Sequence, residues 1–182
     1  MDISPATQAE VDQLIAAAGP AAQHHLRARW ETQQRGDGLF LLARRDGEIV
    51  GQTMLLHHSY YAEVRAALDP VEINALHAFV PNQGVGTAII RAAEEIAGSW
   101  SRPLIGLAVG LDNHGARRLY ERLGYEPWDG PQVIDTWTEQ DADGNVVRTH
   151  ADPCDYLLKP LSQAVSDDSP PDPAALRADG SA

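Results

Sequence analysis

The sequence predicts a mixed α/β fold in which one central sheet carries helices on both faces. Apolar residues switch repeatedly between helical and strand spacing over residues 1–161, with short strands before and after single helices. Glycines stand at several of these junctions, where tight turns are needed. A length of 182 residues corresponds to about one domain, large enough to bury on the order of 70% of its unfolded surface.

The first half of the domain is expected to contain two helices and an antiparallel hairpin. Val11, Leu14 and Ile15 lie on one helical stripe, and Gly19-Pro20 ends it. Asp46-Gly47 separates two apolar runs, as in two-residue hairpin turns. The expected elements are a short N-terminal strand, helices over 7–18 and 20–35, strands over 39–44 and 48–57, and a loop or short helix over 59–69.

The second half alternates strands and helices and closes with a hairpin. Gly124 can adopt the left-handed conformation that ends a helix, so it predicts the end of the helix over 113–123. Asp143-Gly144 predicts the turn between the last two strands. Pro153 cannot donate to a ladder, so its strand is expected to lie at an edge or to bulge there. The expected elements are strands over 71–80 and 104–109, helices over 87–97 and 113–123, and strands over 133–139 and 146–158.

Composition argues against several classes of protein. Acidic side chains number 26 against 14 basic ones, a net charge of −12 that disfavours nucleic-acid binding. The longest apolar run, over 104–111, is far shorter than the roughly 20 residues that span a bilayer. A lone Cys154 and an N-terminus without signal-peptide character favour a cytoplasmic location. Residues 162–182, rich in Asp and Pro, are expected to form a disordered tail outside the 1–161 domain.

A first candidate site lies where the strand over 71–80 leads into a helix through Gly84-Val85-Gly86. A strand, a glycine loop and a helix in succession present backbone N–H groups at a helix N-terminus, which suits an anion such as phosphate. A tight turn without a ligand is the alternative. A dinucleotide-binding fold fits poorly, because its fingerprint requires glycine where Ile89 stands.

The second segment runs Asn113-His114-Gly115-Ala116-Arg117-Arg118-Leu119-Tyr120-Glu121-Arg122-Leu123-Gly124-Tyr125. Together with the Gly-x-Gly loop it resembles the GNAT superfamily, which moves an acyl group from coenzyme A to an amine. The resemblance covers nearly all of residues 1–161. It implies a mostly antiparallel sheet, a cofactor cleft where the fourth and fifth strands splay, and direct transfer of an acetyl group from acetyl-CoA to a primary amine.

The resemblance also implies which residues bind the cofactor. In the family, backbone amides of the loop grip the pyrophosphate; here those belong to Gln83, Gly84, Val85, Gly86 and Thr87. The pantetheine arm is expected along the strand edge at Leu76, His77 and Ala78, with an N–H of Leu76 or His77 holding the thioester oxygen. Pro81 departs from the family pattern, and the loop is about two residues short. A shifted alignment lets Gln83 replace the missing side chain.

Three further residues have a candidate role and a structural alternative. Tyr120 matches the general acid that protonates departing coenzyme A, although its apolar stripe also suits a core residue. Asn113 matches a residue that touches the cofactor, or is only a helix cap. Glu72 matches the general base, acting directly or through water; the alternatives are a partly exposed strand carboxylate or an electrostatic contact to substrate.

Other polar residues receive weaker assignments. His77 and the pair His57-His58 are candidates to line the cleft beside Glu72, without any metal-ligand spacing. Arg117 and Arg118 are expected on a solvated helix face, and Cys154 in the core.

The acceptor is not identified by the sequence. Small amines, aminoglycoside-like antibiotics, amino acids and protein amino groups all stay open, and the family favours a homodimer. Two alternatives are a non-catalytic module that binds or senses acyl-CoA, suggested by the loop at Pro81, and a scaffold without cofactor.

Overall fold

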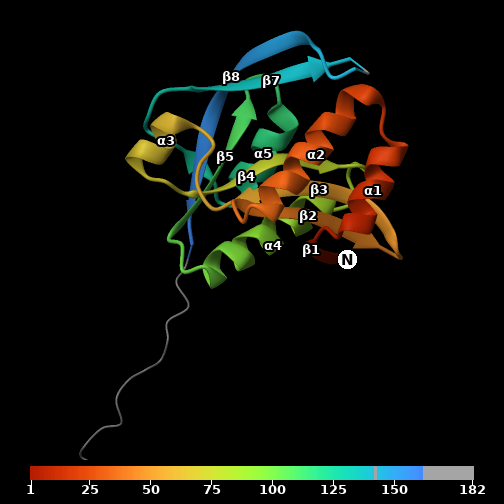
Figure 1. Cartoon of the computed structure of the whole chain (residues 1–182). Coiled ribbons are helices and arrows are strands. Elements are labelled where there is room, and N and C mark those ends of the chain that lie inside the picture. The colour runs from red at the N-terminus through yellow and green to blue at the C-terminus, as the bar shows by residue number, and fades with distance from the viewer. Residues whose placement is uncertain (142, 162–182) are drawn as a thin grey trace, which may run out of the picture.

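The computed structural model describes residues 1–141 and 143–161, so the expected tail over 162–182 lies outside the described residues. Figure 1 shows the arrangement of the elements. In chain order they are β1 (Asp2–Pro5), α1 (Gln8–Ala17), α2 (Pro20–Gln34), β2 (Gly38–Arg45), β3 (Glu48–Leu56), α3 (Ala62–Ala67), β4 (Val71–Ala78), α4 (Val85–Ser99), β5 (Leu104–Gly110), α5 (His114–Arg122), β6 (Glu126–Pro127), β7 (Val133–Gln140) and β8 (Val146–Pro160).

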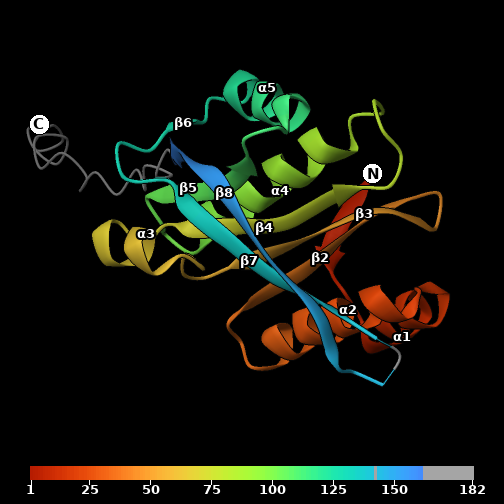
Figure 2. The same cartoon turned by 90° about the horizontal axis from the view of Figure 1, so that it is seen from above.

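The strands form one mixed sheet in the order β1-β2-β3-β4-β5-β8-β6, with β7 paired to β8. Every pairing is antiparallel except β4 with β5, which confirms the mostly antiparallel sheet. Helices α1 and α2 cover one face, and α4 and α5 lie on the other (Figure 2). Neighbouring residues of β2 therefore pack on opposite faces: Leu41 joins the core beneath α4, whereas Phe40 and Leu42 join the core beneath α1 and α2.

Strands β4 and β5 separate almost as soon as they pair. Only Val71 and Glu72 are in register with β5, opposite Ile105 and Gly106. Further along β4, the register with β3 shifts between Gln52 and Met54, and Ala75 has a φ of 52°. A left-handed residue at an irregularity of this kind bends the strand. The splayed cleft implied by the family resemblance is confirmed, and a β-bulge in β4 lies at its mouth.

Local sequence signals predicted most of the helices, strands and turns correctly. Asp46 and Gly47 have φ values of 52° and 85°, as a hairpin turn with two left-handed residues requires. Pro153 lies in a part of β8 that is paired with β7 alone, so the expected edge position is confirmed; the irregularity of that hairpin lies at Glu139 and Gln140 instead.

The structure moves the start of one helix, resolves one ambiguous segment and adds one short strand. Helix α4 begins at Val85 rather than Thr87, because Gly84 rather than Gly86 adopts the left-handed conformation before it. The ambiguous segment over 59–69 contains the short helix α3. The two-residue strand β6 pairs with β8 through Glu126 and Pro127, too short a segment to show a period.

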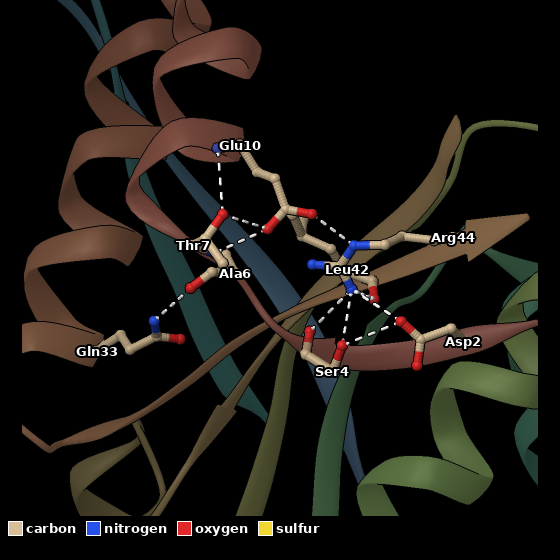
Figure 3. A network of polar contacts seen from close by, with 8 residues as sticks. All are labelled: Asp2, Ser4, Ala6, Thr7, Glu10, Gln33, Leu42 and Arg44. Atoms are coloured by element: carbon tan, nitrogen blue, oxygen red, sulfur yellow. Dashed lines mark hydrogen bonds and ion pairs between the residues drawn. The ribbon is translucent and has the colours of Figure 1, made fainter. Parts of the chain in front are cut away.

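A polar network ties the first two strands to the first two helices (Figure 3). Arg44 of β2 donates to Glu10 of α1 over 2.5 Å and to Ser4 of β1 over 2.9 Å. Thr7 and Glu10 cap α1 reciprocally, and Gln33 of α2 donates to the carbonyl of Ala6 over 2.9 Å. The hydrogen bond from Arg44 is the main reason that the pKa of Glu10 falls to about 2.

Candidate active site

The loop before α4 has the geometry of an anion site. Gly84 has a φ of 76°, which a residue with a side chain rarely adopts. No side chain in the part of the chain that the structure describes caps this end of α4, and its first backbone hydrogen bond joins the N–H of Ala88 to the carbonyl of Gly84. The N–H groups of Val85, Gly86 and Thr87 precede that bond and therefore point out of the helix end, where a phosphate can accept them.

A positive charge stands beside this loop. The guanidinium of Arg45, at the end of β2, donates to the side-chain oxygen of Gln83 and, over 3.1 Å, to its backbone carbonyl. Gln83 is therefore held by the β2–β3 hairpin. Sequence reasoning missed Arg45, because no local pattern links positions 38 residues apart.

Close packing joins the loop to the strand edge and to α5. A Cβ atom on Gly86 would lie 3.3 Å from Leu119 of α5 and 3.8 Å from Leu76 of β4, so glycine permits this approach. His77 is exposed and its ring meets Phe79 edge-on at 5.2 Å between centroids. Leu76, His77 and Ala78 thus follow the bulge, on the part of β4 that β5 does not cover.

Helix α5 carries the two other family residues. Asn113 accepts the N–H of Ala116 over 3.1 Å, so it caps the helix as expected from its position. Tyr120 lies in the main core with 7% of its surface exposed, and burial raises its pKa to about 12. Within the described chain its hydroxyl forms no hydrogen bond, yet it keeps contact with the surface, unlike the buried and unpartnered hydroxyl of Tyr125.

Glu72 is fully buried at the point where β4 and β5 part. Oε2 accepts hydrogen bonds from the Ser59 hydroxyl at 2.7 Å, the Tyr156 hydroxyl at 3.0 Å and the Tyr60 N–H at 3.1 Å. Oε1 accepts from the Asn74 amide at 3.1 Å. Burial raises the pKa of Glu72 against the opposing effect of these four donors. The alternative of a partly exposed strand carboxylate is wrong.

A glycine makes room for one of those donors. A Cβ atom on Gly106 would lie 2.6 Å from the ring and the hydroxyl of Tyr156. The ring therefore lies against bare β5 backbone, and from there its hydroxyl reaches Glu72.

A cavity of about 740 Å³ opens between α2, β7 and the splayed strands. Asn74, which donates to Glu72, lines this cavity, so the buried carboxylate is one side chain away from it. The charged and aromatic side chains of its wall that bear on the chemistry are Arg29, Tyr60, Tyr61, Asp135 and Trp137.

Burial perturbs several groups of this wall. It raises the pKa of Asp135, against a smaller opposing effect of Tyr61, and raises the pKa of the Cys154 thiol. It lowers the pKa of His25, to which His24 and Arg29 add their repulsion. The cavity therefore holds groups whose pKa values are shifted from those of exposed side chains.

The histidines named from sequence do not gather beside Glu72. His57 packs against Trp100 at 4.1 Å between ring centroids, and His58 pairs with Asp69 at 2.6 Å. Both line a second cavity of about 690 Å³, and His77 lines neither. No group of three His, Cys, Asp or Glu in residues 1–141 and 143–161 is placed to hold a metal ion.

The remaining minor assignments are resolved by contacts. Arg117 is paired with Asp155 rather than solvated, whereas Arg118 is exposed as expected. Cys154 is buried, as expected for a core residue.

The sequence did not predict the residues that line the larger cavity, such as Arg29, Asp135 and Trp137. One signal was available: Asp135 and Trp137 alternate along β7, so they share a face of that strand. Polar residues of α2 gave no signal by themselves, because a charged helix face is ordinarily a solvated one.

Comparisons with known proteins agree with this architecture. A model of the acetyltransferase (GNAT) family matches residues 8–125, well over half of the chain. An uncharacterized N-acetyltransferase of Methanocaldococcus jannaschii is 40% identical over 55 residues, 30% of this chain and 23% of that protein. The match thus spans less than a quarter of that relative.

Solved structures share the fold at low sequence identity. A ribosomal-protein-alanine N-acetyltransferase from Brucella melitensis superposes with a TM-score of 0.62 at 18% identity, over 88% of this chain and 100% of that one. A candidate acetyltransferase from Salmonella typhimurium, solved with acetyl-CoA, gives 0.60 at 16% identity, over 93% and 98%. None of the described helices is long and apolar enough to cross a membrane. With the Gly-x-Gly loop, the bulged β4 and the α5 motif in place, the chain belongs to the acetyltransferase (GNAT) family, whose members move acyl groups from coenzyme A to amines.

Proposed function

We propose that this protein transfers an acetyl group from acetyl-CoA to a primary amine by direct attack. One observation carries the proposal: β4 and β5 part after Glu72, and the freed part of β4 first lines the cavity beneath α2 and then leads into the amide-lined loop before α4. The two reactants can therefore approach from different sides and meet at the opening between the strands.

The loop and strand edge would hold acetyl-CoA, which supplies the activated acyl group as a thioester. The pyrophosphate would accept the N–H groups of Val85, Gly86 and Thr87 beside the charge of Arg45, with Gln83 and Gly84 shaping the loop. The pantetheine would lie along Leu76, His77 and Ala78, one of whose N–H groups holds the thioester oxygen. Asn113, at the start of α5, would border the arm.

The acceptor amine would lose its proton toward Glu72 through a water. With a lysine-like pKa near 10.4, forming the neutral amine at pH 7 costs about 4.6 kcal/mol. A base whose pKa is raised toward neutrality serves this step better than an exposed carboxylate does. The amine nitrogen then bonds to the acyl carbon, and the carbon–sulfur bond breaks.

Tyr120 would donate a proton to the departing sulfur. Its hydroxyl has no partner among the described residues, and it lies on α5 beside Leu119, which packs against the α4 loop. A pKa of about 12 keeps the phenol protonated until the thiolate forms.

Two further elements complete the proposal. We place the protein in the cytoplasm, because a single buried thiol is compatible with a reducing compartment. We also expect it to form a homodimer, as related enzymes do. Sedimentation and fractionation of cells test these two points.

A screen for thiol release from acetyl-CoA across amines and peptides tests the activity. Release that depends on one class of amine, and that falls in Glu72→Gln and Tyr120→Phe variants, supports the transferase. Tight calorimetric binding of acetyl-CoA without release from any amine would instead support the non-catalytic module suggested by the loop at Pro81. Absence of any thermal shift with acetyl-CoA would support a scaffold.

A further inference from the structure

We propose that Arg29 binds a carboxylate of the acceptor, so that the protein acts on small primary amines of amino-acid type. This inference rests on the proposed function, because it places the acceptor in the cavity beneath α2. It commits to a carboxylate-bearing amine rather than to a polyamine, an aminoglycoside-like amine or a protein amino group.

Arg29 differs from the other arginines of comparable burial. Of residues 1–141 and 143–161, five arginines are half-buried. Four of them have polar partners: Arg44 with Glu10, Arg45 with Gln83, Arg102 with Asp69 and Arg117 with Asp155. Arg29 has neither a hydrogen bond nor an ion pair in this part of the chain, and it lines the larger cavity.

A half-buried guanidinium without a partner is costly, since it loses water contacts and gains no protein contacts in return. Burial alone lowers the pKa of Arg29, whereas that of Arg44 is raised by Glu10. The planar guanidinium has a fixed fork of donors that matches a carboxylate. A ligand carboxylate would therefore supply the missing partner.

The surroundings of Arg29 add no compensating negative charge. His25 lies one helical turn earlier and experiences the charge of Arg29 as repulsion. Asp135 lines the same cavity from β7, yet no carboxylate of the described residues lies within 4.0 Å of Arg29. One cavity thus holds a separated positive and negative group, the arrangement that suits the two charges of an amino acid.

The cavity also suits the uncharged part of such a ligand. Met54, Leu56, Tyr61 and Trp137 provide apolar wall between the polar groups. A volume of about 740 Å³ lies within the roughly 300–1,000 Å³ of small-molecule sites. The net charge of −12 opposes an acidic ligand only weakly at 0.1 M salt, because interactions between exposed charges farther apart than about 10 Å are largely screened.

Matched pairs of acceptors test the inference. L-Phenylalanine, L-leucine and 6-aminohexanoate are each compared with their primary amides, which keep a primary amine and a similar shape but remove the negative charge. Rates are compared per neutral amine, because the amide also lowers the pKa of an α-amine. Thiol release from acetyl-CoA gives kcat/KM for each member. We expect the wild type to prefer at least one acid over its amide by about 30-fold, since truncating one partner of a buried charge pair costs about 2 kcal/mol or more.

Two variants of α2 separate the site from the general charge of the helix. In Arg29→Gln, the kcat/KM values for an acid and its amide should differ by no more than about 3-fold. This corresponds to about 1 kcal/mol or less of discrimination between the two acceptors. Arg27→Gln is the matched control: Arg27 is exposed, donates to Gln23 and does not line the cavity, so the preference should persist. Thermal unfolding of both variants shows whether the fold is intact.

A binding measurement distinguishes failure of this inference from failure of the proposed function. Calorimetry of the same acids and amides with the coenzyme A-loaded protein measures the preference without turnover. Acid-selective binding that Arg29→Gln abolishes, without thiol release from any amine, supports the ligand class and overturns the transferase. Equal use or binding of acids and amides by the wild type, or equal effects of both variants, overturns the role of Arg29.

Discussion

Glu72→Gln is the substitution that tests the chemistry most directly, because the structure predicts that it preserves the fold. The amide oxygen can occupy the Oε2 position, where Ser59, Tyr60 and Tyr156 donate. The new NH₂ group then faces only the side chain of Asn74, whose amide can turn to present its oxygen. Asn74 pairs with one of the two N–H donors and the other has no described partner, so we expect a loss of stability of about 1–3 kcal/mol, or about 2–12 °C in Tm, that leaves the protein folded.

The same substitution should cost activity in a pH-dependent way. General-base catalysis contributes about 10²–10⁴-fold, and the cost of 4.6 kcal/mol for a lysine-like amine sets a ceiling of about 2,500-fold at pH 7. Without the base, the rate should rise about tenfold per pH unit as the neutral amine accumulates, and it should approach the wild-type rate near the pKa of the amine. Thiol release at saturating acetyl-CoA from pH 6 to 10 measures this profile.

Asp135→Asn is the control, since Asp135 is the carboxylate that lines the acceptor cavity itself and its pKa is also raised. We expect Asp135→Asn to change KM for the amine and to leave the dependence of kcat on pH unchanged. A loss in Glu72→Gln that does not depend on pH, or a pH-dependent loss in Asp135→Asn alone, would show that Glu72 is not the base.

Three other changes test separate parts of the structure. Tyr120→Phe should lower kcat by about 10²-fold with little change in KM, because its hydroxyl has no partner among the described residues to lose; an unchanged kcat excludes the acid role. Arg45→Gln should raise KM for acetyl-CoA by about 3–10-fold, since it removes the charge beside the loop, and calorimetric binding that is unaffected by the change contradicts this. Glu10, with a folded pKa of about 2 against 4.5, contributes stability above pH 4.5 that is lost as pH falls toward 2. After solvent screening this amounts to about 1 kcal/mol, so the stability difference between wild type and Glu10→Gln in urea should shrink from pH 7 to pH 3, and a constant difference refutes the pairing.

Local conformational demands explain why parts of the fold were predictable. Asp46-Gly47 predicted the hairpin because its turn needs two left-handed residues, and both have positive φ. Gly124 predicted the end of α5 for the same reason, with a φ of 87°. The Gly-x-Gly loop was correctly placed before a helix, although which glycine is left-handed was not predicted.

Long-range packing explains what was not predictable. Residues 59–69 carry no period that distinguishes a loop from α3, whose Val64 is buried against β7 and β8 residues. The burial of Glu72 depends on Tyr156, 84 residues away, and on the bare backbone at Gly106. The residues next to Glu72 in the sequence therefore do not predict its contact with Tyr156 or the space that Gly106 leaves for that ring.

The sequence by itself determined the order of the longer strands and helices, the two motifs and the family that they indicate, because each depends on spacing within a short segment. Tertiary structure decided the chemistry. It buried Glu72 among four donors, brought Arg45 to the loop, and set Arg29, which has no polar partner among the described residues, in the same cavity as Asp135. Burial and the absence of a partner arise only when distant segments pack together, so no local pattern contains them.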